Sequence, residues 1–289
     1  MIWFLWAVLG SVFAAALSES NRILRFDAQI LNAWRATFGA VLLALAIPYM
    51  QWPTDRFFYI VAGLDGIVAG IGMVFFFILS ARKTGRVSSM ILPMAAISAY
   101  LTWWMMHPEL RPELVDNPFQ VLVACVSMTI VCVAMQLLRE NDASLESFLI
   151  VLPVGISFGI IDSLTKGVFL EHDLIGMALS YSFVAMCCCA LTSWLAVIPE
   201  PLGGRRNKIV DPKMFTGAFW CAFFTVGITV AEVMALRIAP NPALPGILMV
   251  LTPLWLFGFN FLRKVEDDVS LTASILILVG AVGLLLSTF

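Results

Sequence analysis

The sequence predicts an all-helical integral membrane protein with ten transmembrane helices, arranged as two inverted repeats of five. Of its 289 residues, 61% are hydrophobic and only 12% are charged, whereas soluble domains carry about 25% charged residues. Water could not hydrate so apolar a surface, and lipid must therefore be the solvent for much of it. The net charge of -2 shows no basic excess, and we expect no nucleic-acid partner.

Ten apolar segments have the length of about 20 residues that a helix needs to cross the hydrocarbon core. The first half of the chain supplies 2–18, 29–50, 58–80, 88–106 and 119–137. The second half supplies 148–170, 174–198, 214–236, 245–263 and 270–288. The first segment has no basic residues before it, and we expect a retained helix and not a cleaved signal. The connections are short, so the function must reside in the membrane or at its faces.

The two halves of the chain resemble each other. A shift of 145 positions aligns Gly10 with Gly155, Phe13 with Phe158, Ser18 with Ser163, Ala33 with Ala178 and Phe38 with Phe183. Pro93 and Pro253 hold equivalent places in the fourth and ninth segments, 160 positions apart. Because five is odd, the second repeat (143–289) must enter the membrane from the side opposite to the first (1–142). Secondary transporters have this design, with a binding site near the midplane.

The distribution of Lys and Arg predicts the orientation. Connections that follow odd-numbered segments contain twelve of them: Arg22, Arg25, Arg82, Lys83, Arg86, Arg139, Arg205, Arg206, Lys208, Lys213, Arg263 and Lys264. The other connections contain three, Arg56, Arg111 and Arg237. We therefore expect the odd-numbered connections in the cytoplasm, and both termini outside a plasma membrane.

Taken together, these features resemble the drug/metabolite transporter superfamily in its ten-helix EamA-type form. The resemblance rests on the two five-helix halves, on Pro93 and Pro253, on Glu266, and on a Gly-rich last segment around Gly280 and Gly283. It implies a central cavity bounded by helices 1, 3, 4, 6, 8 and 9, with helices 5 and 10 peripheral. Two features depart from the family. Met106-His107 stands where members commonly carry Gly-Glu, and members commonly keep both termini in the cytoplasm.

Five charged residues lie at membrane depth: Arg35, Asp65, Asp162, Lys166 and Glu232. Each costs at least ~2.5 kcal/mol on insertion scales, and such residues usually face a cavity or a partner. Asp162 and Lys166 are one helical turn apart. They either form a structural salt bridge or open to receive the two charges of a zwitterion.

Asp65 stands among glycines that permit close approach of a backbone or a solute, or that simply pack against another helix. Burial disfavours the ionised form of a carboxylate, so Asp65 or Glu232 could take up and release a proton. Arg35 could hold a carboxylate or phosphate bidentately. Since it is close to a helix end, we expect it to reach the headgroups instead.

Four aromatic residues are candidates for the wall of a pocket, Tyr100, Tyr181, Trp220 and Trp255. Lipid contact or core packing is the alternative for each. Pro93 and Pro253 each free a backbone carbonyl inside a helix and are candidate kinks beside the cavity.

These observations favour a secondary transporter that moves a small polar or zwitterionic metabolite by alternating access, with protons as a possible coupling partner. A flippase for an amphiphile is the alternative, and a membrane-embedded enzyme is a third reading. No H-E-x-x-H, G-x-S-x-G or phosphate-binding loop occurs, and the chain is not expected to be an enzyme. Six cysteines without paired spacing and two histidines predict neither a metal nor a cofactor. We expect a monomer or homodimer.

Overall fold

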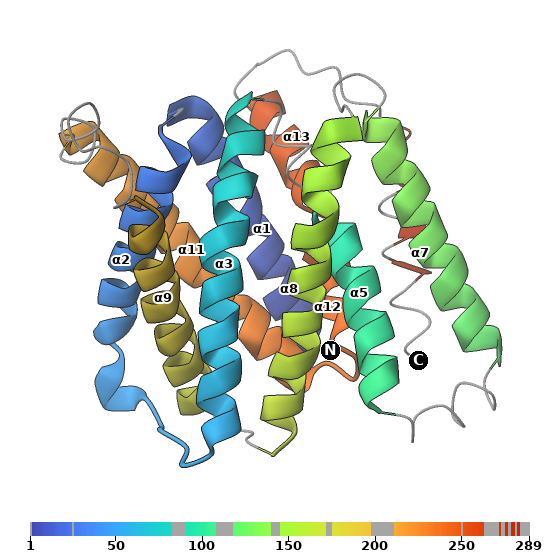
Figure 1. Cartoon of the computed structure of the whole chain (residues 1–289). Helices are drawn as coiled ribbons and strands as arrows, with labels where there is room; N and C mark the ends of the chain where they lie inside the picture. Colours follow the sequence, from blue (N-terminus) through green and yellow to red (C-terminus); the bar gives the residue numbers. More distant parts are fainter. Residues whose placement is uncertain are drawn as a thin grey trace.

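A computed structural model describes residues 2–24, 26–82, 91–107, 118–139, 145–171, 175–197, 211–249 and 251–262, and single residues between 272 and 283. Within these residues the secondary structure is helical and contains no strand. Figure 1 shows the helices as a bundle in which most elements run up or down in alternation. The predicted all-helical fold class is confirmed.

The helices follow the apolar segments of the sequence. Their bounds are α1 Ile2–Leu24, α2 Ala28–Ala44, the 3-10 turn η1 Ile47–Tyr49, α3 Arg56–Arg82, α5 Ile91–Met106, α7 Pro118–Arg139, α8 Leu145–Glu171, α9 Ile175–Val197, α11 Pro212–Ile238, α12 Ala243–Met249 and α13 Thr252–Leu262. Side-chain caps fix two of the starts, because Asp27 accepts from the backbone of Gln29 and Ile30, and Asp211 accepts from that of Lys213.

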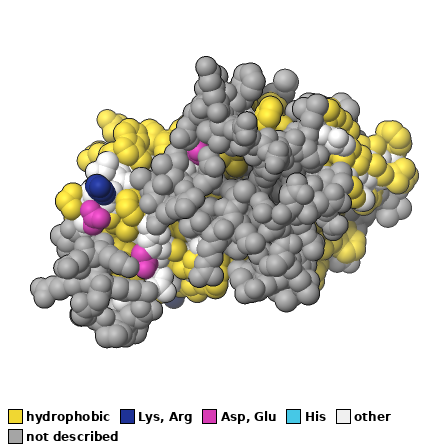
Figure 2. Space-filling view, turned by 90° about the horizontal axis from the view of Figure 1, so that it is seen from above, with side chains coloured by type: hydrophobic (Ala, Val, Ile, Leu, Met, Phe, Trp, Pro, Cys, Tyr) yellow, Lys and Arg dark blue, Asp and Glu magenta, His cyan; other side chains and the backbone are white. Residues whose placement is uncertain are grey.

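Five of the described helices are long and apolar enough to cross a membrane, namely Ile2–Ser20, Arg56–Ile78, Leu152–Phe169, Ile175–Val197 and Pro212–Ile238. Large apolar side chains such as Leu5, Ile71 and Leu191 point outward and are more than half exposed. Figure 2 shows hydrophobic side chains along the outer sides of the described helices. These features are consistent with a membrane protein.

Two of the predicted segments differ from the observed helices. The segment 29–50 ends early, because α2 stops at Ala44 and a short 3-10 turn that contains Pro48 follows. Pro48 has no N–H to donate to the carbonyl oxygen of Ala44, so the helical hydrogen bonds cannot continue there. The predicted helix 245–263 is divided, since α12 ends at Met249 and α13 begins at Thr252. The last predicted helix, 270–288, lies largely outside the described residues.

Small residues bring the helices close together. A Cβ atom on Gly66 of α3 would lie 2.6 Å from Cβ of Cys188 in α9. A Cβ atom on Gly155 of α8 would lie 2.6 Å from Cβ of Met94 in α5. Glycine permits this approach, as small residues commonly do between membrane helices. The α3–α9 and α5–α8 pairs are among the main contacts of the bundle, together with α1–α11 and α2–α9, while α7 lies at its side (Figure 1).

Candidate functional site

The helices enclose a central cavity of about 160 Å³. Residues of α1, α2, α3, α5, α8, α9, α11 and α12 line it, so both halves of the chain contribute. Most of the wall is apolar. Its charged members are Arg35, Asp65, Asp162 and Glu232, and its hydroxyl-bearing members are Thr165, Thr225 and Thr229. The sequence predicted all four charged residues as site candidates, and the structure brings them to one cavity.

Three carboxylates from three different helices face this cavity. Asp65 comes from α3, Asp162 from α8 and Glu232 from α11. Asp162 lies close enough to both Asp65 and Glu232 for their charges to act on it. Each of the three side chains is half-buried. Like charges so placed repel one another, so a proton, an ammonium group or another cation would relieve the cluster.

Tyr181 supports the acidic cluster from α9. Its side chain is fully buried and lies near the carboxylate of Asp65. Its hydroxyl also lies 2.6 Å from Oγ1 of Thr165, with either oxygen able to donate. Tyr181 does not line the cavity itself, although the sequence proposed it as a wall residue. Its hydrogen-bond partner Thr165 does line the cavity.

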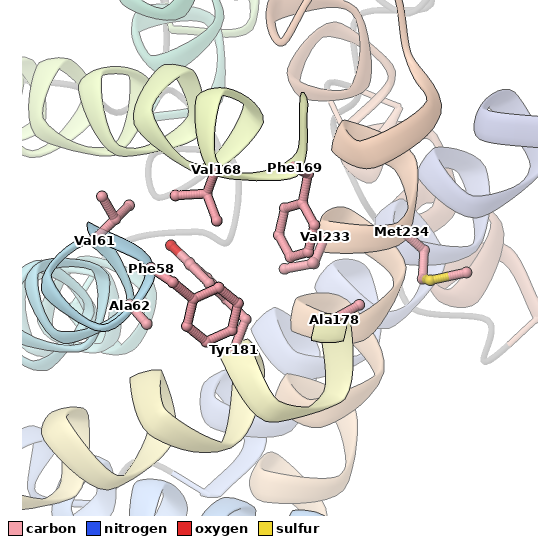
Figure 3. Packing of buried hydrophobic residues seen from close by; sticks show 9 residues of the cluster. All are labelled: Phe58, Val61, Ala62, Val168, Phe169, Ala178, Tyr181, Val233 and Met234. Carbon is pink, nitrogen blue, oxygen red and sulfur yellow. The ribbon is translucent and has the colours of Figure 1, made fainter. Parts of the chain in front are cut away.

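Packed apolar side chains lie next to the acidic residues of the cavity. Tyr181 lies between Phe58 and Phe169, with ring centroids 5.7 and 5.6 Å away, in a cluster with Val61, Ala62, Val168, Ala178, Val233 and Met234 (Figure 3). Along α3 this cluster precedes Asp65, and along α8 it follows Asp162 and Thr165. The apolar cluster therefore lies between the three carboxylates and the start of α3.

Arg35 is buried in the wall and does not reach the headgroups, which corrects the expectation from its place near a helix end. Its side chain is 1% exposed. Its Nε and Nη2 donate to Oδ1 of Asn32 at 3.0 and 2.7 Å, and Nη2 also donates to Sγ of Cys189 at 3.4 Å. The guanidinium carbon lies 5.8 Å from the ring centroid of Phe77. These contacts hold the guanidinium inside the bundle.

Asn32 is a site residue that the sequence analysis missed. It is fully buried, and its Nδ2 donates to the carbonyl oxygen of Gly70 and to Oγ of Ser193, both at 2.9 Å. Asn32 thus ties Arg35 of α2 to α3 and α9. The sequence contains a signal for Asn32. It stands three residues before Arg35 in an apolar helix, and residues at this spacing share one helix face.

Lys166 lies apart from the cavity-lining residues of the described chain. Its amine is buried and donates to the carbonyl oxygen of Arg237 at 2.9 Å. Arg237 is near the end of α11, so Lys166 places positive charge where a helix C-terminus has unpaired carbonyl groups. The sequence analysis also proposed that Lys166 and Asp162 separate to bind the two charges of a zwitterion. This stays a prediction.

The other aromatic candidates are outside the described cavity wall. Trp220 is 51% exposed on the outer face of α11, where it packs beside Phe223 and Phe224. Nε1 of Trp255 donates to Oγ of Ser11 at 2.9 Å and joins α13 to α1. Tyr100 is half-buried on α5. Of these, Trp220 is placed for lipid contact.

The kinks predicted at Pro93 and Pro253 stay predictions, because each proline lies near the start of a described helix. Pro253 is the second residue of α13, directly after the interruption that separates it from α12. Pro93 is the third described residue of α5, and residues 83–90 before that helix lie outside the described ones.

Comparison with known proteins identifies a fold but not a family. No protein-family model matches the chain, and no curated protein matches it in sequence. A solved structure, described only as a crystal structure of a protein, is similar to it with a TM-score of 0.65 and 14% sequence identity. The similarity covers 99% of this chain and 96% of the other. At that identity it supports the fold alone.

Proposed function

We propose that the chain is a secondary transporter, which moves a small polar or zwitterionic solute across a plasma membrane through the central cavity by alternating access. The observation that carries this proposal is the convergence of Arg35, Asp65, Asp162 and Glu232 on one cavity from four helices. Each charge at membrane depth costs at least ~2.5 kcal/mol, and such charges commonly mark the paths of solutes and ions. A protein with only a structural role would gain nothing from placing four of them around a void.

Helix packing supports the inverted repeat that alternating access needs. If α1 corresponds to α8, α2 to α9, α3 to α11, and α5 to α12 with α13, the contacts of the bundle map onto one another. The pair α1–α11 then corresponds to α8–α3, α3–α9 to α11–α2, and α5–α8 to α12–α1, and all six pairs are in contact. Transport by rocking of two related halves around a fixed site is the usual consequence of such a design.

Individual contacts repeat in the same way. Oγ of Ser98 in α5 donates to the carbonyl oxygen of Ile156 in α8 at 3.0 Å, and Oγ1 of Thr252 in α13 approaches that of Ser11 in α1 at 3.4 Å. Ser11 and Ile156 are 145 positions apart, which is the shift that aligns the two halves. Gly10 and Gly155, aligned by the same shift, each face a methionine of the helix that packs there, Met249 and Met94 respectively.

Membership of the EamA-type drug/metabolite transporters fits this arrangement. The cavity wall includes α1, α3, α5, α8, α11 and α12, which correspond to the six helices that the resemblance names, and α2 and α9 contribute as well. The side position of α7 agrees with a peripheral fifth helix (Figure 1).

The proposed orientation places the basic connections in the cytoplasm. In Figure 1, α1 and α3 end and α2, α8 and α11 begin at the upper end of the view, so these described helix ends, which flank connections rich in Lys and Arg, share one side of the bundle. The apolar cluster around Tyr181 lies on the opposite side of the acidic residues, toward the start of α3.

The acidic cluster is the proposed site of proton coupling. Asp65, Asp162 and Glu232 form no ion pair with a described basic residue, and two of them repel the third. Burial disfavours charge on a carboxylate, so release of a proton and arrival of a cationic group can replace each other at this place. Exchange of that kind links solute movement to a proton gradient.

A flippase is the second candidate, and the apolar wall of the cavity favours it. Residues such as Leu17, Met73, Phe76 and Phe158 would suit an acyl chain better than a polar metabolite. The charged members of the wall favour the metabolite, because an acyl chain offers them no partner.

Uptake by proteoliposomes tests the proposal. Purified protein is reconstituted and exposed to a defined mixture of labelled metabolites, with protein-free liposomes as the control and with or without an imposed pH gradient. We expect protein-dependent accumulation of at least one small polar or zwitterionic solute. Movement of fluorescent phospholipid between leaflets, without uptake of any soluble metabolite, would contradict the transporter and favour the flippase.

A further inference from the structure

We infer that Arg35, held by Asn32, is a carboxylate-binding subsite of the cavity, separate from the acidic cluster. The inference deepens the proposed transport function, on which it rests, by naming one chemical group of the solute. Arg35 combines two properties that a structural arginine does not need together: its side chain is 1% exposed, and it lines an internal cavity.

The hydrogen bonds of Arg35 leave part of the guanidinium free. A guanidinium has five N–H donors. Nε and Nη2 donate to Asn32, and Nη2 also donates to the sulfur of Cys189. Nη1 has no hydrogen-bond partner among the described residues, and no described acidic side chain forms an ion pair with Arg35. The guanidinium is therefore held in one orientation, but the N–H donors at its Nη1 end have no described acceptor.

The free end of the fork suits a carboxylate. Nη1 can donate outright, and Nη2 is engaged there only by a sulfur atom at 3.4 Å, which is a weak acceptor. A carboxylate that takes the place of the thiol contact would accept two parallel N–H bonds in the geometry that arginine prefers. Burial strengthens such a pair, because little water competes for either partner.

The rest of the cavity limits the solute. A cavity of about 160 Å³ is close to the ~150 Å³ void that holds a benzene molecule in an engineered protein, so the ligand is small. Three carboxylates share the wall with the single arginine, and they would repel the second charge of a phosphate. A small organic monocarboxylate with an apolar body satisfies the arginine and the apolar wall together.

The positions of the two charged regions favour a carboxylate and an ammonium group at different ends of the solute. Asn32 contacts Gly70 of α3, five residues beyond Asp65, which corresponds to about 7.5 Å along a helix axis. The guanidinium also contacts Phe77, still farther from the acidic cluster. A chain such as 5-aminopentanoate therefore matches the arrangement better than a single charged group does.

Ligand-dependent thermal stabilisation of the purified full-length protein tests the subsite, because a ligand that binds the folded state raises its unfolding temperature. The probes are pentanoate, 5-aminopentanoate, pentylamine, neutral pentanamide, and inorganic phosphate at matched ionic strength. We expect pentanoate and 5-aminopentanoate to raise the unfolding temperature, and pentanamide and phosphate to leave it unchanged.

Variants assign the effect to Arg35. Arg35→Gln is expected to abolish the response to pentanoate while keeping the response to pentylamine. Arg35→Lys, which keeps the charge but not the fork, should weaken the apparent affinity for pentanoate about tenfold or more. Arg56→Gln is the matched control, because Arg56 is exposed at the start of α3, and it should respond like the wild type. If Arg35→Gln does not fold, two other measurements test the subsite. They are the response of Arg35→Lys to pentanoate and the comparison of pentanoate with pentanamide on the wild type.

Three outcomes would overturn the inference. Stabilisation by pentylamine but not by pentanoate would remove the carboxylate subsite and leave the transporter standing. Stabilisation by phosphate alone would assign Arg35 to a different anion. An equal response of wild type and Arg35→Gln to pentanoate would place the carboxylate elsewhere. Failure of the transport function itself is measured separately, by the uptake of the metabolite mixture.

Discussion

The two charged regions of the cavity differ in how the protein supports them. Arg35 is held by its own helix neighbour Asn32, which in turn is fixed to α3 and α9. The carboxylates of Asp65, Asp162 and Glu232 come from three helices, and among the described residues their close charged neighbours are one another. The first region is held in a fixed orientation by the protein and leaves only Nη1 without a described partner, whereas the second consists of like charges that need a cation or proton from outside. This difference suggests that Arg35 binds the carboxylate of the solute and that the acidic cluster exchanges a proton for a cationic group.

Removing two members of the acidic cluster should have the largest effect. Asp65→Asn and Glu232→Gln are expected to abolish the response of uptake to a pH gradient while the fold is retained, because an amide cannot exchange the proton. Uptake by proteoliposomes with and without the gradient measures this.

Asp211→Asn is the matched control for the acidic cluster. Asp211 caps the start of α11, and asparagine is as good a capping residue as aspartate. Uptake by the Asp211→Asn variant should therefore respond to the pH gradient as in the wild type. If Asp65→Asn and Glu232→Gln both still respond to the gradient, the coupling assignment is wrong.

A change in the spacing between the two regions should have the next largest effect. Gly66 adjoins Asp65 and faces the backbone of Cys189, which contacts Arg35. A Cβ atom there would lie 2.9 Å from the Cys189 nitrogen, so Gly66→Ala should cost about 1–3 kcal/mol through overpacking. Thermal unfolding in detergent measures the loss.

Gly63 offers a comparison within the same helix. Its nearest neighbour would be Sγ of Cys188, at 3.9 Å from an added Cβ, and Gly63→Ala should be neutral or stabilising. Equal destabilisation by the two substitutions would contradict the close approach of α3 and α9.

Loss of the amide beside Arg35 should destabilise the rigid region. Asn32→Ala removes the acceptor for Arg35 and the side-chain bonds to Gly70 and Ser193, which should cost about 2 kcal/mol. Ser182→Ala is the control, because Ser182 bonds only to Ala178 of its own helix. A change in unfolding temperature no larger than that of the control would mean that Asn32 does not organise the region.

The smallest effect is expected at Tyr181. Tyr181→Phe keeps the ring beside Phe58 and Phe169 but removes the hydroxyl that bonds to Thr165. Side-chain hydrogen bonds in membrane proteins contribute about 0.6 kcal/mol on average, so the unfolding temperature should change little. A loss as large as that of Gly66→Ala would show that the acidic region is as rigidly built as the arginine region.

Hydropathy and charge predicted the helices and the charged residues of the cavity. They did not predict in which direction individual side chains point. Apolar runs placed the described helices, and the cost of buried charge selected Arg35, Asp65, Asp162 and Glu232. The fate of Arg35 was misjudged because the position of a residue along a helix does not reveal the buried amide that holds it. Trp220 was a candidate for its depth, but depth does not tell which face of α11 the indole occupies. The division between α12 and α13 falls directly before Pro253, a signal that the apolar run alone does not carry.

Blocking the cavity tests the central claim, that solute passes between the two halves, most directly. Thr229 of α11 lines the cavity, and Thr216 of the same helix is exposed. Thr229→Trp should abolish uptake of the metabolite mixture by proteoliposomes, because an indole fills a void of this size, whereas Thr216→Trp should transport like the wild type. Undiminished uptake by a folded Thr229→Trp variant would contradict passage through this cavity.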